Sequence, residues 1–121
     1  MKNPLILSQS TKFTTVLFAA FKSSKEKWFK NEIFSLALQA DRTAETAFDK
    51  NFKGSFVKTI SKTRAYWSEI QSMLLIAETM QLCKPEPVAK CLKELETLQK
   101  LSFGLLRHIE AKKKAKQEAA A

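Results

Sequence analysis

Glycine and proline are scarce in this chain of 121 residues, which contains two glycines and three prolines. A β-rich fold needs many more turn residues, because its short strands are separated by tight connections. Apolar residues nevertheless make up 45% of the chain, which is enough for one hydrophobic core. The composition therefore predicts a single domain, residues 1–121, built from long helices.

Cysteine and histidine are scarce too. Cys83 and Cys91 are the two cysteines, and His108 is the single histidine. Two cysteines in a helical chain without an export signal are typical of reduced thiols that pack in the core. A zinc site needs more ligands, and the motifs that bind phosphates, dinucleotides or a catalytic zinc are missing. We therefore predict a protein that is not an enzyme and has no cofactor and no metal.

Long apolar runs are missing as well. The longest, residues 16–21 and 73–77, fall far short of the roughly 18 residues that a membrane span needs. The N-terminal segment has one lysine and a short apolar run, which does not amount to a signal peptide. We expect a cytoplasmic protein with no membrane partner.

Apolar residues recur at steps of three and four along four segments, as they do when they share one face of an α-helix. The pattern breaks near Ser23, Gly54 and Pro85. It predicts helices at about 10–22, 24–53, 56–82 and 87–112, and an all-α fold, an antiparallel up-down four-helix bundle. Apolar periodicity fails after Ile109, so the basic segment 110–121 is expected to be a frayed extension or a disordered tail.

Three local signals mark the helix ends. Gly54 is expected in the left-handed conformation that ends a helix, because glycine has no Cβ to clash. Ser55 is expected to cap the following helix, with almost no loop between. Ser23 and Glu26 have the spacing of a capping box for the second helix.

A pattern of small and polar residues spans the last three predicted helices. It reads Q-x-x-R-x-A-x6-N-x-x-G, then W-S-E-I with a leucine and an alanine, then L-x-K-L-x-x-G-x-L. Its members are Gln39, Arg42, Ala44, Asn51, Gly54, the segment 67–70, Leu74, Ala77, Leu98, Lys100, Leu101, Gly104 and Leu106. The joint spacing, over about residues 25–109, resembles the four helix bundle protein superfamily.

The resemblance implies one of two branches. One is Avd, the accessory variability determinant of diversity-generating retroelements; it implies a pentameric barrel that binds nucleic acid and engages a reverse transcriptase during mutagenic cDNA synthesis. The other is encoded by intervening sequences in bacterial 23S rRNA genes and has an obscure role. That branch usually has an acidic residue where this chain has Lys53, so the departure favours the Avd-like branch. A basic bundle that serves only protein assembly stays open as a third alternative.

Acidic residues number 12 against 21 lysines and arginines, which gives a net charge of +9. Such a charge favours RNA or DNA as a partner, whereas the alternative is a solvated basic surface. An up-down bundle returns the end of its fourth helix to the connection between the second and third. The predicted nucleic-acid-binding residues are Lys50, Lys53, Lys58, Lys62, Arg64, Arg107, Lys112, Lys113, Lys114 and Lys116. Because most are lysines, they favour phosphate contacts over base readout.

Other polar residues allow two interpretations. Gln39, Arg42 and Asn51 either form a buried network that fixes helix register, or Arg42 contacts RNA or a partner. Asp41 and Glu45 are expected to face solvent.

Surplus apolar surface points to assembly. The predicted helix 56–82 carries a second apolar line beside the first, more than one seam requires, which predicts a homo-oligomer. The phenylalanines lie mostly at core spacing, whereas Trp28 and Trp67 are candidates for stacking on bases or for a protein interface.

Overall fold

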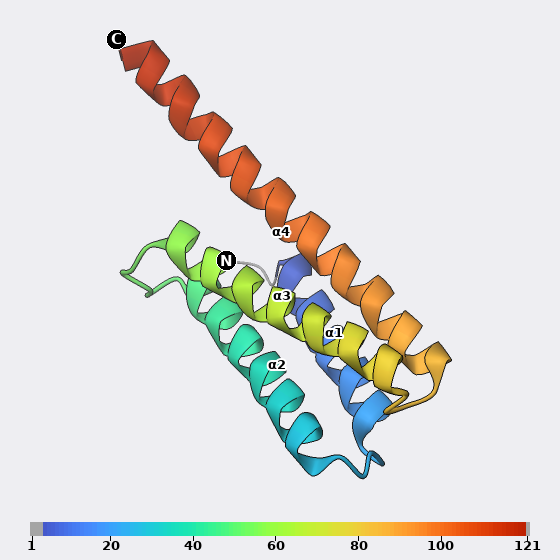
Figure 1. Ribbon diagram of the computed structural model, residues 1–121. Helices are drawn as coiled ribbons and strands as arrows, with labels where there is room; N and C mark the ends of the chain where they lie inside the picture. Colours follow the sequence, from blue (N-terminus) through green and yellow to red (C-terminus); the bar gives the residue numbers. More distant parts are fainter. Residues whose placement is uncertain (1–3, 121) are drawn as a thin grey trace.

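The computed structural model describes residues 4–120. Its four helices are α1 (Leu5–Phe21), α2 (Lys27–Phe48), α3 (Phe56–Met80) and α4 (Pro85–Ala120). Successive helices run in opposite directions, and α4 returns alongside α1, so each helix packs against two others (Figure 1). The described residues contain no strand, which confirms the predicted all-α four-helix bundle. None of these helices combines the length and the apolarity that crossing a membrane would require.

The pair of α2 and α3 is the most extensive contact in the bundle. The inner face of α2 is made largely of alanines, which let the axis of a neighbouring helix approach closely. These buried alanines are Ala37, Ala40, Ala44 and Ala47. In contrast, α3 contributes large side chains, among them Trp67 and Ile70, which are at most 1% exposed. One polar contact crosses the pair, where the hydroxyls of Thr43 and Thr63 lie 2.6 Å apart.

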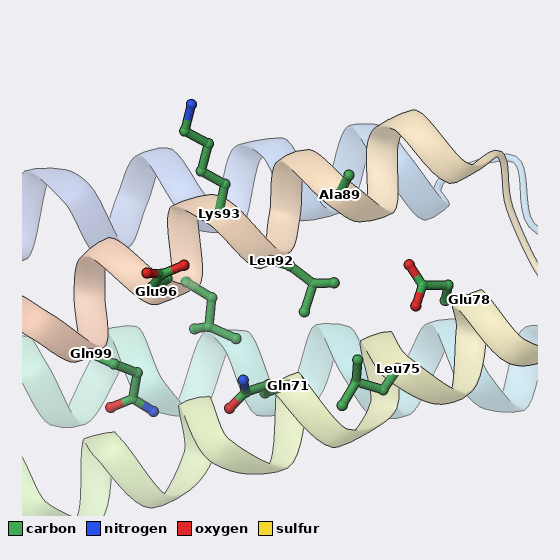
Figure 2. A pocket seen from close by; sticks show the side chains of 9 residues that line it. Gln71, Leu75, Glu78, Ala89, Leu92, Lys93, Glu96 and Gln99 are labelled. Atoms are coloured by element: carbon green, nitrogen blue, oxygen red, sulfur yellow. The ribbon is translucent and has the colours of Figure 1, made fainter.

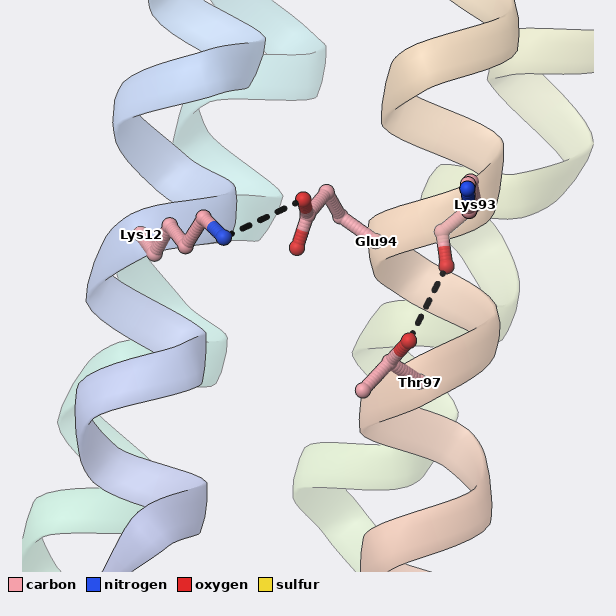
Figure 3. Close-up of polar contacts among 4 residues, drawn as sticks. All are labelled: Lys12, Lys93, Glu94 and Thr97. Carbon is pink, nitrogen blue, oxygen red and sulfur yellow. Dashed lines mark hydrogen bonds and ion pairs between the residues drawn. The ribbon is translucent and has the colours of Figure 1, made fainter.

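The other half of the core lies between α1 and α4. Phe13, Leu17 and Phe21 form the buried stripe of α1 at steps of four residues. Cys91 of α4 is fully buried; burial raises the pKa of its thiol to about 12, so it packs as a small apolar group. At the surface an ion pair joins α1 to α4, with Lys12 Nζ 3.5 Å from Glu94 Oε1 (Figure 3).

Two expectations about the middle of the chain are wrong. Helix α2 covers 27–48 instead of 24–53, because Asp49 is extended and its carboxylate accepts the backbone N–H of Asn51 at 2.8 Å. Gly54 is not left-handed; it lies in a connection of residues 49–55, where a Cβ would overlap the ring of Phe52. The predicted cap is confirmed, since the Ser55 hydroxyl accepts the backbone N–H of Lys58 at 3.1 Å.

Other helix ends also differ from the sequence prediction. The capping box of Ser23 and Glu26 is wrong: the hydroxyl of Ser24 accepts the backbone N–H of Glu26, and no side chain caps α2. Helix α1 begins at Leu5 instead of residue 10, and buried Ile6 anchors its first turn in the core. Helix α3 ends at Met80, followed by Gln81 in the left-handed conformation.

The basic C-terminal segment is helical through Ala120, which corrects the expectation of a frayed or disordered tail. Alanine, lysine and glutamate are strong helix formers, and a helix that is already packed can lengthen without a new nucleation step. The 36 residues of α4 span about 54 Å. Residues 110–120 are all exposed, so about 16 Å of α4 projects beyond the bundle (Figure 1).

Truncation after Ile109 should leave the bundle intact, because the projecting residues bury nothing. We expect the free energy of unfolding in urea to change by less than about 0.5 kcal/mol, while the helical circular dichroism signal per chain falls. Trp67→Ala is the contrasting variant and should cost about 3–5 kcal/mol, because it leaves a cavity between α2 and α3. A truncated chain that loses several kcal/mol would show that the projection contributes to the core.

Candidate nucleic-acid interface

The ten predicted basic residues lie at the surface. Nine are exposed and Arg64 is half-buried. Within residues 4–120, the ion pairs are Lys12 with Glu94 and Lys100 with Glu96, so none of the ten is neutralised by an acidic neighbour. Their positive charges are therefore available to an anionic partner.

The structure brings some of these residues together and separates others. The α2–α3 connection and the projecting part of α4 lie at the same end of the bundle, as expected (Figure 1). Helix geometry, however, turns Lys58 and Lys62 about 120–160° away from Arg64 around α3. No side-chain hydrogen bond or ion pair in residues 4–120 joins Lys50 or Lys53 to α4. The ten residues thus cover more than one face.

Arg64 is the residue that links α3 to α4 at this end. Its Nε donates to Gln99 Oε1 at 3.1 Å, and Gln99 Nε2 donates back to the backbone carbonyl of Arg64 at 3.4 Å and to Ser68 Oγ at 3.3 Å. The guanidinium carbon lies 5.4 Å from the ring centroid of Phe103, and that of Arg107 lies 5.7 Å from the same centroid. Gln99, Phe103 and Arg107 follow one another at steps of four, so they share one face of α4.

An open groove of about 370 Å³ adjoins this constellation. Three cations and one carboxylate line it, together with apolar side chains; the lining residues are Val57, Arg64, Phe103, Leu106, Arg107, Ile109, Glu110 and Lys113. A larger groove of about 720 Å³ lies further along the same helix pair (Figure 2). Its charged residues are Glu78, Glu96 and Lys93, so a phosphate would meet more negative than positive charge there. Of the two, the smaller groove suits a polyanion.

Phe103 and Gln99 were not identified as site residues in the sequence. The signals were nevertheless present: Phe103 falls outside the apolar stripe of its helix, and antiparallel packing places it across from Arg64. The tryptophans singled out instead lie elsewhere. Trp67 is buried, while Trp28 is 60% exposed near the α1–α2 connection, with its indole N–H donating to Glu26 at 3.1 Å.

A buried polar cluster joins α1 to α2 where solvent-facing carboxylates were expected. Ser10 and Thr14 are buried and both donate to the carboxylate of Asp41, Thr14 at 2.8 Å. Burial raises the pKa of Asp41, which its two hydroxyl donors partly oppose and the charge of Glu45 reinforces. Asp41 therefore fixes the α1–α2 contact instead of facing solvent. In the described part of the chain, no three His, Cys, Asp or Glu side chains are grouped to hold a metal ion.

The raised pKa of Asp41 sets the sign of a pH effect on stability. The folded state binds the proton of the Asp41 carboxyl more tightly than the unfolded state does. Protonated Asp41 therefore contributes fully to the free energy of unfolding below the unfolded pKa, and this contribution is lost as pH rises through the folded pKa. The difference in unfolding free energy between wild type and Asp41→Asn should therefore fall as pH rises from about 3, and then level off. Urea titrations from pH 3 to 7 measure it; a difference that grows with pH would mean a lowered pKa.

The residues of the family-like pattern do not form the buried network that was one interpretation of them. Gln39 bonds locally to Ser35 at 3.2 Å, while Arg42 and Asn51 are exposed, because alanines occupy the inner positions of α2. Gly104 is exposed too, and a Cβ there would meet nothing within 4 Å. The chain matches no protein-family model and no curated protein sequence.

Proposed function

We propose that the protein is a non-enzymatic accessory protein that binds nucleic acid through the basic residues at one end of its bundle. The observation that carries this proposal is the set of ten cations that form no ion pair with another side chain of residues 4–120; three of them line one groove. Phosphate neutralisation by lysine and arginine, with release of condensed counterions, supplies most sequence-independent affinity for nucleic acid. Binding should therefore be strong at low salt and weakly dependent on sequence.

The cellular role that we propose rests on the resemblance over about residues 25–109. We propose an Avd-like protein, a cytoplasmic partner of the reverse transcriptase of a diversity-generating retroelement. Of the residues in that pattern, Arg42 is exposed beside Gln39 in a shallow groove on α2, so it is open to a partner. The rRNA intervening-sequence branch and a purely assembling bundle are the alternatives. An adjacent reverse-transcriptase gene supports the first assignment, whereas a position inside an rRNA gene supports the second.

We also propose that the protein assembles into a homo-oligomer, a pentamer by the same resemblance. Apolar side chains remain exposed on the C-terminal half of α3: Leu75 is 48%, Ile76 46% and Met80 55% exposed. Leu75 and the half-buried Leu92 line the larger groove between α3 and α4 (Figure 2). Exposed apolar surface of this kind is typical of a subunit contact. It also lies away from the basic end, so assembly and nucleic-acid binding use separate surfaces.

Removal of lysines from the projection tests nucleic-acid binding. Replacing Lys112, Lys113 and Lys116 with glutamine should weaken binding to duplex DNA about tenfold or more at 0.1 M salt. If all three contact phosphate, the slope of log affinity against log salt should become less steep by up to about 2.7. Fluorescence anisotropy across a salt series measures both quantities, and glutamine keeps the helix propensity of the segment.

The matched control removes the same charge from the opposite end of the bundle, with Lys22, Lys25 and Lys27 replaced by glutamine. We expect this variant to keep the steep slope and most of the affinity. Equal losses of affinity in both variants would mean that binding depends only on the net charge of the protein. If affinity and slope are unchanged in the first variant, these lysines form only a solvated surface, which is what the alternative of a purely assembling bundle predicts.

Leu75→Glu tests assembly. A carboxylate at the centre of the proposed contact should favour the monomer, because burying an unpaired charge costs several kcal/mol. Multi-angle light scattering at micromolar concentration should report an oligomer for wild type and a smaller species for the variant. Ser61→Glu is the control, because it adds the same charge at an exposed position near the other end of α3, away from the proposed contact. A monomeric wild type would contradict the proposal.

A further inference from the structure

The geometry points to Phe103 as a stacking platform for an unpaired base, so that the groove between α3 and α4 takes single-stranded nucleic acid. Arg64, Arg107 and Lys113 would then contact the phosphates on either side of the stacked base. This inference rests on the proposed function and narrows it from nucleic acid in general to a single strand.

The first support is the exposure of the ring. Phe103 is 49% exposed, so about half of its surface is open to a ligand. The guanidinium carbons of Arg64 and Arg107 lie over the ring at 5.4 and 5.7 Å from its centroid, which is within cation–π distance. Because the side chain is still half exposed beside these two cations, a base can stack on the part of the ring that they leave open.

The second support is the fixed position of Arg64. Its Nε is held by Gln99, and Gln99 is itself held by the backbone of Arg64 and by Ser68. The Nη groups of Arg64 make no hydrogen bond to residues 4–120, so they remain free for a bidentate contact with a phosphate. A guanidinium held beside an aromatic ring pays little entropy when it binds, which favours a defined site over diffuse attraction.

The third support is the combination of groups in the groove. Val57, Leu106 and Ile109 supply apolar lining, and the charged lining consists of three cations and the carboxylate of Glu110. A base presents an apolar face and a phosphate presents a charge, so an unpaired nucleotide matches both parts. Duplex DNA presents its phosphates and the edges of its base pairs, whereas the faces of its bases are stacked on one another, so it leaves the ring of Phe103 without a stacking partner.

The test compares single-stranded and duplex probes by fluorescence anisotropy at fixed salt. The probes are a 20-mer of deoxythymidine, a 20-mer of uridine and a 20-base-pair DNA duplex. Phe103→Ala should weaken binding to the single strands by about 5- to 100-fold and change duplex binding by less than about twofold. Phe103→Tyr should retain single-strand affinity, because it keeps the ring. Comparison of the two single strands tells whether the site takes DNA, RNA or both.

Trp28→Ala is the matched control, since Trp28 is an exposed aromatic residue at the opposite end of the bundle. It should leave all three affinities unchanged. The inference is overturned if Phe103→Ala leaves single-strand binding intact, weakens both kinds of probe equally, or converts an oligomer to a monomer in light scattering. Wild-type protein that binds no probe would overturn the proposed function as well, whereas binding that ignores Phe103 would overturn the inference alone.

Discussion

The close packing of α2 against α3 is the contact on which the rest of the molecule depends. The two helices can approach closely because α2 has alanines where a longer side chain would hold them apart. Large side chains of α3, such as Trp67, fill the space that the alanines leave. Both helices are then held in one register, with the Thr43–Thr63 hydroxyl contact between them. α1 adds to this pair on the α2 side and α4 on the α3 side, and the two outer helices complete the ring.

The position of the candidate site follows from that ring. Because α4 packs against α3, the side chains that α4 turns toward its neighbour meet those of α3 in antiparallel order. Gln99 reaches the backbone of Arg64 at one turn, and Phe103 and Arg107 follow at the next two turns. The groove therefore exists without any loop of special geometry. It is built from successive turns of α4, including the start of its projecting part, together with Val57 and Arg64 of α3.

The fold was largely predictable from the sequence, because apolar periodicity reports which face of each helix is buried. The ends of the helices were less predictable. Asp49 ended α2 through a bond to a backbone N–H, which competes with the helix over only a few residues and leaves no periodic signal. The buried cluster around Asp41 was missed for a related reason. Serine, threonine and aspartate at helical spacing are predicted to be surface residues unless their partners on the neighbouring helix are known. The end of the bundle at which the basic residues gather could be predicted from topology alone. The face on which each lysine lies could not, because it depends on how each helix is rotated about its own axis.

The projection of α4 carries its charge in an unusual arrangement. Successive residues of an α-helix are rotated by about 100°, so Lys112 and Lys116 point one way while Lys113 and Lys114 point in two other directions. Residues 110–120 have no buried side chain. The four lysines spread over about 200° of the circumference of the helix, and the remaining side carries Ala111, Ala115 and Glu118. A flat anionic partner could meet only part of the positive charge at a time, whereas a flexible strand could wind around the helix and meet all of it.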